Sequence, residues 1–377
     1  MEESIQELID SVHPRESLKF EGLENLSLTW KYLDVPEPNP KKVRIFYRNL
    51  RVRGEGKARA SICMVHGFAE HSGKLLNVAA YFALEGFEVH LIDLRSYGLS
   101  GGARCGHSLI EFQQDIKVLL EQARSDIPCF LYGHSMGGLL VTTVLINNPG
   151  LSLSGAILSA PLYETSSAEI DPVKQCAMGQ LTTALKEMVL NSYIAPACLS
   201  KDDEFLKNVF KDTKLMPLFG IELGLSLLDH MAHVLKSAHR IKHPVVFFHG
   251  DADILTYAKT TEKVFNMASS ADKTFRIVPG AYHEPHHDLM RDTFIPELVQ
   301  WANQRVKNLP LGKICGFKAG LPGLPSSHSW KKILVWVFAL AYLIIAVRIK
   351  VRLNPIKLLK LWNLFQRVFW PVKLILG

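Results

Sequence analysis

The pentapeptide Gly133-His134-Ser135-Met136-Gly137 has the form G-x-S-x-G, and an apolar run flanks it on either side. The run before it, 129–132, has the length of a buried strand, and the run after it, 139–146, favours a helix. A strand, a tight turn and a helix around G-x-S-x-G form a nucleophile elbow, whose serine hydroxyl projects above the sheet edge. The two glycines give the strained turn the space that it needs. We therefore predict that Ser135 is a nucleophile, although a bare G-x-S-x-G also arises by chance.

From residue 60 onward, short apolar runs alternate with helical patterns, which is typical of parallel strands joined by crossover helices. Helices are expected at 77–84, 109–120, 139–146 and about 288–306. Two earlier runs with alternating polarity favour antiparallel strands. The expected strands are Leu26–Tyr32, Val43–Val52, Ala60–Val65, Phe87–Ile92, Pro128–Tyr132, Gly155–Leu158, Val245–Phe248 and Phe275–Val278. The sequence thus predicts an α/β fold with a mostly parallel, doubly wound sheet.

The alternation stops for more than 80 residues after about residue 160, where helical periodicity continues without a clear strand. We expect a helical cap or lid at 161–243, inserted between two parts of the core at 26–160 and 244–306. Residues 1–25 are interpreted as an N-terminal leader that begins with acidic residues. This leader lacks the apolar region of a secretory signal peptide, so no such signal is expected. The Gly, Pro and Ser content of 307–330 predicts a linker.

An elbow serine needs a base and an acid, and these follow it in the chain order serine, acid, histidine. Asp253 follows the predicted strand Val245–Phe248, and His283 follows Phe275–Val278. Sites on open α/β sheets form at the carboxyl ends of the strands. We therefore predict a triad in which His283 takes the Ser135 proton and Asp253 holds the imidazole. Asp251 is the alternative acid. Taken singly, Asp253 could instead cap a turn, and His283 could be a histidine of a surface loop.

The loop after the first parallel strand reads Val65-His-Gly-Phe-Ala-Glu-His-Ser-Gly73. A second donor to an oxyanion is expected there, so the predicted oxyanion hole consists of the backbone N–H groups of Phe68 and Met136. The same loop contains Glu70 and His71, which are expected to brace the turn rather than react.

Two further histidines, His286 and His287, give an H-x-x-H-H run with His283 that could suggest a metal site. A helical H-E-x-x-H zinc motif is absent from the sequence, so neither a metal ion nor another cofactor is expected. The six cysteines form no C-x-x-C pair and are interpreted as reduced thiols, which favours a reducing, cytosol-like or organelle-matrix compartment. They are Cys63, Cys105, Cys129, Cys176, Cys198 and Cys315.

The formal net charge of +7 arises from the C-terminal part of the chain. Residues 301–377 contain 13 Lys and Arg and no Asp or Glu, so the other 300 residues have 30 basic against 36 acidic side chains. A nucleic-acid-binding body is therefore not supported.

The C-terminal segment combines an apolar stretch with a basic amphipathic pattern. Ile333–Val347 is uninterrupted and apolar over 15 residues, whereas a spanning helix needs about 20. After Pro355, basic side chains at 357, 360 and 367 share one helical face opposite leucines and aromatics. We expect 331–377 to attach the protein to a membrane, either spanning it or lying in its interface. A groove of a membrane-protein partner is the alternative.

Six blocks in order resemble the monoacylglycerol lipase-like branch of the α/β-hydrolases, which is related to the serine aminopeptidase S33 and lysophospholipase-like proteins. The blocks are His66-Gly-Phe-Ala-Glu-His-Ser-Gly, Asp93-Leu-Arg-Ser-Tyr-Gly-Leu-Ser-Gly-Gly, Gly133-His-Ser-Met-Gly-Gly, Ser159-Ala-Pro-Leu-Tyr, His249-Gly-Asp-Ala-Asp and Ala281-Tyr-His. The resemblance extends over about residues 40–305. It implies a serine esterase or lipase that acts on monoacylglycerols, lysophospholipids or related acyl esters, with Ser135, Asp253 and His283 as the triad.

Three departures from the family pattern stand out. Ala69 replaces a glycine of the H-G-x-G-E-H loop, and Ser96 replaces a glycine of the D-x-R-G-x-G block. Residues 209–215 lack the tyrosine and the N-D-P-L sequence that the family has in its lid, so the lid surface that selects the alcohol is expected to differ. Two alternatives to ester hydrolysis stay open: a catalytically silent accessory subunit of a membrane complex, and an acyltransferase or thioesterase that uses the same triad.

Overall fold

The computed structural model describes residues 22–36, 42–54, 56–103, 107–164, 189–191, 194–209, 211–306 and 317–320. Nearly all of the predicted leader, about a third of the predicted lid, most of the predicted linker and the entire predicted tail at 331–377 lie outside the described residues. Three cysteines, Cys63, Cys129 and Cys198, are free thiols. The other three, at 105, 176 and 315, lie outside the described part of the chain.

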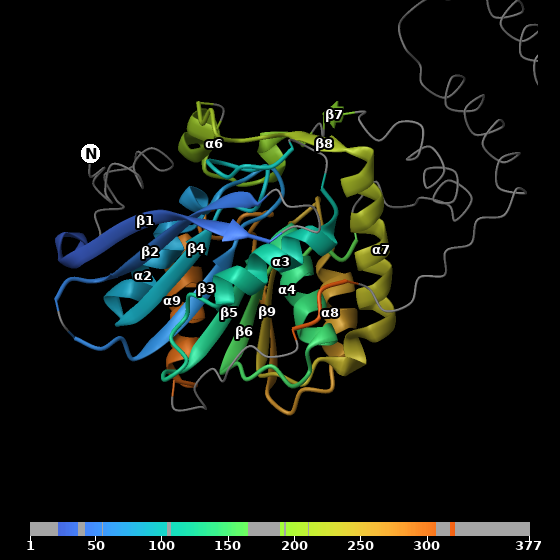
Figure 1. The fold of residues 1–377 in the computed structure, drawn as a ribbon. Helices are drawn as coiled ribbons and strands as arrows, with labels where there is room; N and C mark the ends of the chain where they lie inside the picture. Colours follow the sequence, from blue (N-terminus) through green and yellow to red (C-terminus); the bar gives the residue numbers. More distant parts are fainter. Residues whose placement is uncertain are drawn as a thin grey trace, which may run out of the picture.

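An eight-stranded sheet forms the centre of the molecule, in the order β1-β2-β4-β3-β5-β6-β9-β10 (Figure 1). Strand β2 pairs antiparallel with both of its neighbours, β1 and β4, and every neighbouring pair from β4 to β10 is parallel. The bounds are β1 Leu26–Val35, β2 Val43–Val52, β3 Ala60–Val65, β4 Phe87–Ile92, β5 Cys129–His134, β6 Gly155–Ser159, β9 Val245–Gly250 and β10 Lys273–Val278. The predicted α/β fold with a mostly parallel sheet is confirmed.

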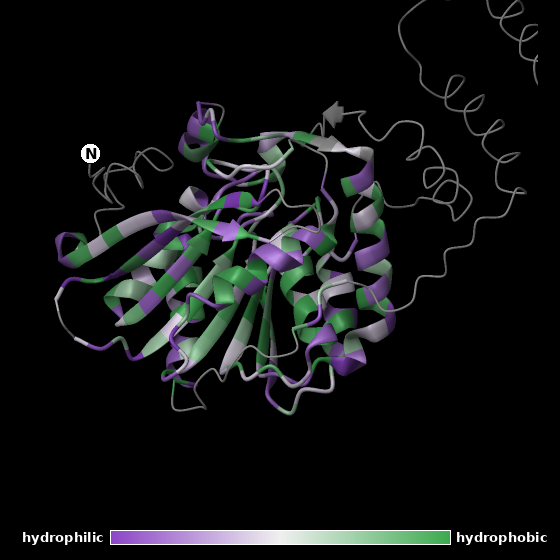
Figure 2. Ribbon diagram, viewed as in Figure 1, coloured by the Kyte–Doolittle hydropathy of each residue, from purple (hydrophilic) through white to green (hydrophobic). Residues whose placement is uncertain are grey.

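Helices cover both faces of the sheet, as a doubly wound fold requires. One hydrophobic core contains residues of α2 and α9, and the other contains residues of α3, α4, α7 and α8. The central strands are buried on both faces, and in Figure 2 they are correspondingly hydrophobic along their length. The helices are α2 Leu76–Leu84, α3 Leu109–Leu120, α4 Met136–Asn147, α6 Asp203–Val209, α7 Ile221–Ser237, α8 Ala258–Met267 and α9 Arg291–Asn303, with short 3-10 turns η2 Leu23–Asn25, η3 Ser72–Leu75, η4 Pro196–Cys198 and η5 Ala238–Arg240.

The terminal helix α9 is shorter than the predicted 288–306. Asp288 is kept out of it by its own side chain, which accepts hydrogen bonds from the backbone N–H of Tyr282 at 2.8 Å and of Lys201 at 3.1 Å. These bonds tie Asp288 to two loops, so the helix begins three residues later at Arg291.

Two short strands interrupt the stretch for which no strand was expected. β7, Val189–Asn191, pairs antiparallel with β8, Leu218–Gly220. Strands of three residues are too short for their side-chain alternation to be read from sequence. The following helix α7 contributes Leu223, Met231 and Val234 to the core shared with α3 and α4. The lid therefore stays a prediction for the residues before α7, whereas α7 packs as a helix of the body.

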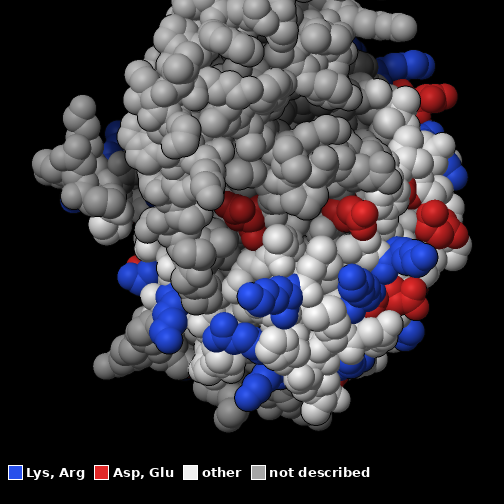
Figure 3. All heavy atoms as spheres, turned by 90° about the vertical axis from the view of Figure 1, so that its right-hand side faces the viewer, with Lys and Arg blue, Asp and Glu red and all other residues white. Residues whose placement is uncertain are grey.

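Several basic side chains lie on the uncovered lower part of the surface that carries α7 (Figure 3). Helix α7 has Glu222 in its first turn and Lys236 in its last, and Arg240 follows in η5. Acidic groups near a helix N-terminus and basic groups near its C-terminus complement the helix dipole. The charged side chains at the two ends of α7 therefore stabilise this helix.

The segment Phe317–Gly320 lies against the body in the middle of the predicted linker 307–330. Asn148 accepts a hydrogen bond from the backbone N–H of Lys318 at 2.7 Å, and its side-chain amide donates to the Lys318 carbonyl at 3.2 Å. The buried Gln113 accepts from Gly320 N at 3.1 Å. Phe317 packs on the core of α3, α4 and α7. The chain is therefore tied to this helical layer beyond residue 306.

Candidate active site

Ser135 connects β5 to α4 in a strained turn. Its backbone has φ 52° and ψ −117°, a left-handed φ that a side chain rarely adopts. A Cβ atom added at Gly133 would lie 2.7 Å from the carbonyl carbon of Gly137, and one added at Gly137 would lie 2.9 Å from that of Val65. Both positions therefore exclude a side chain, and the strand, turn and helix expected from G-x-S-x-G are present.

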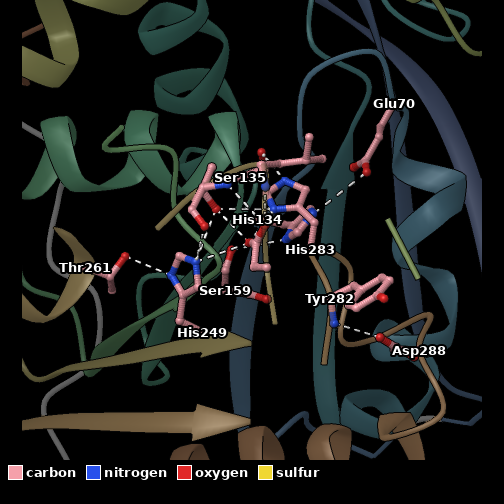
Figure 4. Close-up of polar contacts among 12 residues, drawn as sticks. Glu70, His134, Ser135, Ser159, His249, Thr261, Tyr282, His283 and Asp288 are labelled. Carbon is pink, nitrogen blue, oxygen red and sulfur yellow. Dashed lines mark hydrogen bonds and ion pairs between the residues drawn. The ribbon is translucent and has the colours of Figure 1, made fainter. Parts of the chain in front are cut away.

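The structure brings Ser135, His283 and Asp253 together, although they come from loops after three different strands. Figure 4 shows the side chains of Ser135 and His283 next to each other. His283 Nε2 lies 2.9 Å from Ser135 Oγ, and His283 Nδ1 lies 2.8 Å from Asp253 Oδ2. With the carboxylate ionised, Nδ1 carries a proton toward Asp253 and Nε2 is left to accept from the serine hydroxyl. This arrangement can activate the hydroxyl as a nucleophile.

The carboxylate of Asp253 is held by its own loop. Its Oδ1 accepts from the backbone N–H of Leu255 at 2.8 Å and of Thr256 at 3.1 Å, and Thr256 Oγ1 donates to Oδ2 at 2.8 Å. Burial acts to raise the pKa of Asp253, but the charge of His283 and hydrogen bonds from His249 and His283 hold that pKa well below its usual range. The rival Asp251 instead accepts from Gly280 N at 2.6 Å and does not orient His283.

The pKa of His283 is also shifted. Burial disfavours the charged imidazolium and acts to lower the pKa, but the Asp253 carboxylate outweighs burial and raises the pKa of His283 above its ordinary value of 6.5. A base with a raised pKa accepts a proton more readily, which suits removal of a proton from Ser135.

The loop after β3 is fixed from both ends. Glu70 Oε2 accepts from Gly67 N at 2.9 Å, so Glu70 braces the turn as its position predicted. His66 Nε2 accepts from Leu94 N at 3.0 Å, and its Nδ1 lies 2.7 Å from the Gly67 carbonyl. Burial lowers the pKa of His66 to about 4, so this ring is neutral and donates from Nδ1. The loop thus presents Phe68 to the same cavity as Ser135.

The predicted oxyanion donors flank that serine. Met136 is the first residue of α4, and helix geometry leaves its N–H without an acceptor inside the helix. Phe68 lines the cavity that also contains Ser135. Their role as the two donors stays a prediction.

Ala69 and Ser96, which replace family glycines, both have left-handed backbones, with φ 65° and φ 73°. We expect Ala69→Gly to raise the free energy of unfolding by about 0.5–1 kcal/mol, because a side chain in this conformation costs roughly 1–2 kcal/mol and the added freedom of glycine in the unfolded chain offsets part of the gain. Thermal unfolding should show a Tm increase of about 1–3 °C.

The matched control for Ala69→Gly is Ser96→Gly. It relieves similar strain but removes the hydrogen bond that Ser96 Oγ donates to the Ala103 carbonyl at 2.6 Å, so its Tm should change little. An Ala69→Gly chain that is less stable than wild type would show that the left-handed turn is not a source of strain.

A cavity of about 390 Å³ opens beside Ser135. Residues of the body and of the segment that leads from Ile194 to α7 line this cavity together. They are Phe68, Ala69, Glu70, Lys74, Ser135, Ile194, Pro196, Leu199, Val209, Asp212, Leu215, Pro217, Leu255, His283 and Glu284. The two sides are joined by a 2.7 Å contact from His71 Nε2 to Asp212 Oδ2 and by a hydrogen bond from Met216 N to the Ala69 carbonyl at 2.9 Å. His71 Nδ1 accepts from Gly73 N, which leaves its Nε2 to donate to Asp212.

The three histidines of the H-x-x-H-H run do not form one cluster of possible ligands. His283 Nε2 faces Ser135, and the ring of His134 lies against both His283 and His286, with centroid distances of 5.1 and 4.7 Å. Among the described residues, Glu284, His286 and His287 bring one carboxylate and two imidazoles within 4.8 Å of one another. His283 is not a member of that cluster.

Three side chains near the triad were missed from sequence. Thr256 donates to Asp253, and both Lys74 and Glu284 line the cavity. Their only signals are spacing and adjacency: Thr256 comes three residues after Asp253, Lys74 four after Glu70, and Glu284 directly after His283. None of these is specific without the fold.

Known proteins resemble this chain in sequence and in fold. A family model described as serine aminopeptidase, S33, matches residues 56–290. Human monoglyceride lipase is 28% identical over 258 residues, which cover 66% of this chain and 84% of the human protein. An abhydrolase domain-containing protein of Dictyostelium discoideum is 30% identical, but the match spans 67% of this chain and 27% of that protein. The crystal structure of a monoacylglycerol lipase from Paleococcus ferrophilus aligns with a TM-score of 0.62 at 26% identity, over 74% of this chain and 99% of that chain.

Proposed function

Because the chain belongs to the serine aminopeptidase S33 family of α/β-hydrolases, we propose that it is a serine hydrolase that cleaves acyl esters of the monoacylglycerol or lysophospholipid type. The observation that carries the proposal is the pair of contacts from His283, at 2.9 Å to Ser135 Oγ and 2.8 Å to Asp253 Oδ2. The names of the human and Paleococcus ferrophilus relatives, a monoglyceride lipase and a monoacylglycerol lipase, support an acyl ester as the substrate.

The reaction follows from the positions of these side chains. Ser135 Oγ attacks the ester carbonyl carbon while His283 Nε2 takes its proton, and the oxyanion is stabilised by the N–H groups of Phe68 and Met136. His283 then returns the proton to the leaving alcohol, which gives an acyl-Ser135 intermediate. A water molecule, deprotonated by His283, attacks the acyl group and releases the fatty acid.

The cavity supports a substrate with a substantial apolar part. Its volume of about 390 Å³ lies within the roughly 300–1,000 Å³ that small-molecule sites occupy. Ile194, Val209, Leu215 and Leu255 supply apolar walls that suit an acyl chain. Because this cavity reaches Ser135, a working hydrolase is favoured over a silent accessory subunit.

The pH dependence tests the role of His283. Protonated His283 cannot take the Ser135 proton, and its pKa is raised above 6.5 because the Asp253 carboxylate outweighs burial. We therefore expect kcat/KM to fall as the pH decreases, with a midpoint above 6.5. The measurement is ester hydrolysis over a pH series, with circular dichroism as the control for folding. Undiminished activity at about pH 5 in a folded protein would exclude His283 as the base.

Membrane attachment through 331–377 completes the proposal. In the part of the chain that the structure describes, no helix is both long and apolar enough to cross a membrane. Support comes from the apolar stretch at 333–347 and the basic amphipathic pattern after it. We expect the full chain to sediment with phosphatidylserine vesicles more than a chain ending at residue 330 does. Equal sedimentation of the two would contradict attachment through this segment.

A further inference from the structure

A second cavity, of about 250 Å³, lies at the end of the sheet opposite Ser135. Its lining includes Val52 at the carboxyl end of β2 and Phe87 at the amino end of β4. Because β4 and β5 run in the same direction and Ser135 follows the carboxyl end of β5, the length of a six-residue strand, roughly 20 Å, separates the two sites. The proposed reaction does not use this second cavity.

The cavity is a cleft between two strands that stop pairing with each other. The pairing of β2 with β4 ends at Leu50 and Val89, although β2 continues to Val52 and β4 begins at Phe87. The end of β2 is held by its other neighbour, because the side-chain Nε of Arg53 donates to a backbone carbonyl of β1 at 2.8 Å. The cleft is therefore a fixed feature of the sheet.

The walls of this cleft are strongly basic. Residues 41–59 contain eight Lys and Arg and one acidic residue, Glu55, which lies outside the described residues. A local excess of one charge in a concave site raises the concentration of counter-ions there. The basic side chains that line the cleft are Arg51, Arg53, Lys57 and Arg124.

The carboxylates near the cleft do not neutralise this charge. Glu88 lines the cleft, and its Oε1 accepts a hydrogen bond from Asn49 Nδ2 at 3.3 Å. Asp126 forms an ion pair with Arg124, with 2.6 Å between Oδ2 and Nη2. Within the described ranges, no carboxylate forms an ion pair with the other three basic side chains. Four basic groups and two carboxylates leave a net charge of +2.

A phosphate monoester matches this site better than a carboxylate does. It carries about 1.5–2 negative charges at pH 7 and has three acceptor oxygens, so it can bind several of these basic groups at once. Arginine guanidinium groups donate pairs of parallel hydrogen bonds to such oxygens, and a lysine adds a point charge. The volume is just below the roughly 300–1,000 Å³ of most small-molecule sites, which suits a phosphate with a small attached group.

We propose that the cleft between β2 and β4 is a binding site for a phosphate monoester, which Arg51, Arg53, Lys57 and Arg124 hold. Two sources offer this group: a soluble metabolite and the headgroup of a phosphorylated lipid such as phosphatidate. The site lies at the other end of the sheet from the triad, so the proposal does not depend on the proposed function.

Equilibrium dialysis of the full chain, in micelles of an uncharged detergent, measures the Kd of glycerol 3-phosphate and of glycerate. The two probes differ in having a phosphate or a carboxylate. The cleft variant combines Arg51→Gln with Lys57→Gln. The control variant combines Arg276→Gln with Lys259→Gln and removes the same two types of charge, because Arg276 of β10 and Lys259 of α8 are exposed and do not line the cleft.

We expect wild type to bind glycerol 3-phosphate with a Kd below about 1 mM and glycerate at least about 10-fold more weakly. The cleft variant should weaken glycerol 3-phosphate binding by at least about 10-fold, and the control variant should change it by less than about two-fold. Both variants should keep the circular dichroism and Tm of wild type, since the replaced side chains are exposed.

Sedimentation with phosphatidylcholine vesicles that contain about 10 mol% phosphatidate separates the two sources. All of these chains keep residues 331–377, so a difference between the cleft and control variants reports on the cleft alone. Weaker sedimentation of the cleft variant assigns the phosphate to a lipid headgroup. Equal sedimentation, together with the loss of glycerol 3-phosphate binding, assigns it to a soluble molecule.

The inference is overturned if the two variants sediment equally and wild type binds glycerol 3-phosphate with a Kd above about 1 mM. Equal sedimentation with glycerol 3-phosphate binding that the cleft variant retains, or that both variants lose to the same extent, would overturn it as well. Glycerate that binds as tightly as glycerol 3-phosphate would show that the cleft does not select phosphate. None of these results bears on the triad, so the proposed function would stand.

Discussion

Replacement of Ser135 by alanine should lower kcat/KM for a monoacyl ester by at least about 10⁵-fold and abolish covalent labelling by a fluorophosphonate. The expected loss is large because the hydroxyl is the atom that bonds to the acyl group, and the structure places it 2.9 Å from the base His283. A water molecule in the place of the hydroxyl would not be fixed by the strained elbow turn as Ser135 Oγ is. The residual rate would come from binding and from the oxyanion donors alone.

The stability of the Ser135→Ala chain is the control for this loss. The elbow glycines and the backbone bond from Ser135 N to the Ser159 carbonyl at 3.0 Å do not depend on the side chain, so the variant should fold as wild type does. Thermal unfolding measures this directly. A stable variant that keeps wild-type labelling and turnover would show that the nucleophile lies elsewhere.

Asp253→Asn has the second largest expected effect, a decrease in kcat of about 10⁴-fold. An amide at this position no longer holds His283 in the tautomer that accepts from Ser135, and it removes the charge that raises the pKa of His283. Steady-state kinetics on a monoacyl ester gives the decrease, and it should come with little change in KM.

The matched control is Asp251→Asn, two residues earlier in the same loop. Its carboxylate caps Gly280 N on the exposed side of the loop and has no part in orienting His283, so activity should stay within about three-fold of wild type. The reverse pattern, an inactive Asp251→Asn and an active Asp253→Asn, would reassign the acid to the rival that the sequence also offered.

The strands of the sheet could be predicted because most of them are buried on both faces. A strand such as β3 or β6 is then a short apolar run between turns, and its position is recorded in the residues themselves. The bounds of α9 could not be predicted in this way, since they depend on Asp288 binding two loops that are distant in sequence. The short pair of β7 and β8 has too few residues for a pattern.

The proximity of Ser135, Asp253 and His283 could be predicted for a topological reason. Parallel strands place their carboxyl ends at one edge, so residues that directly follow β5, β9 and β10 must lie near one another. Sequence also offered Asp251, which is two residues nearer to the end of β9, as an alternative acid, and the geometry of the loop places Asp253 at His283. Glu284 and Lys74 could not be found, because their meeting depends on how two loops fold over the cavity.

The structure gives the backbone conformation of Ala69 and Ser96, which the sequence could not give. Both residues replace family glycines, and both keep the left-handed backbone that a glycine adopts without cost. Ser96 compensates through its hydrogen bond to Ala103, whereas Ala69 uses its carbonyl to bind Met216 of the segment that lines the cavity. Both positions thus have a left-handed backbone in this chain although their residues differ from the family pattern.

Peptide mapping by mass spectrometry, after reaction of the folded full chain with a fluorophosphonate, measures directly which residue is the nucleophile. We expect one stoichiometric adduct, on Ser135, which forms at a rate that falls as His283 is protonated. An adduct on a different residue, or no adduct in a folded chain above pH 7, would contradict it.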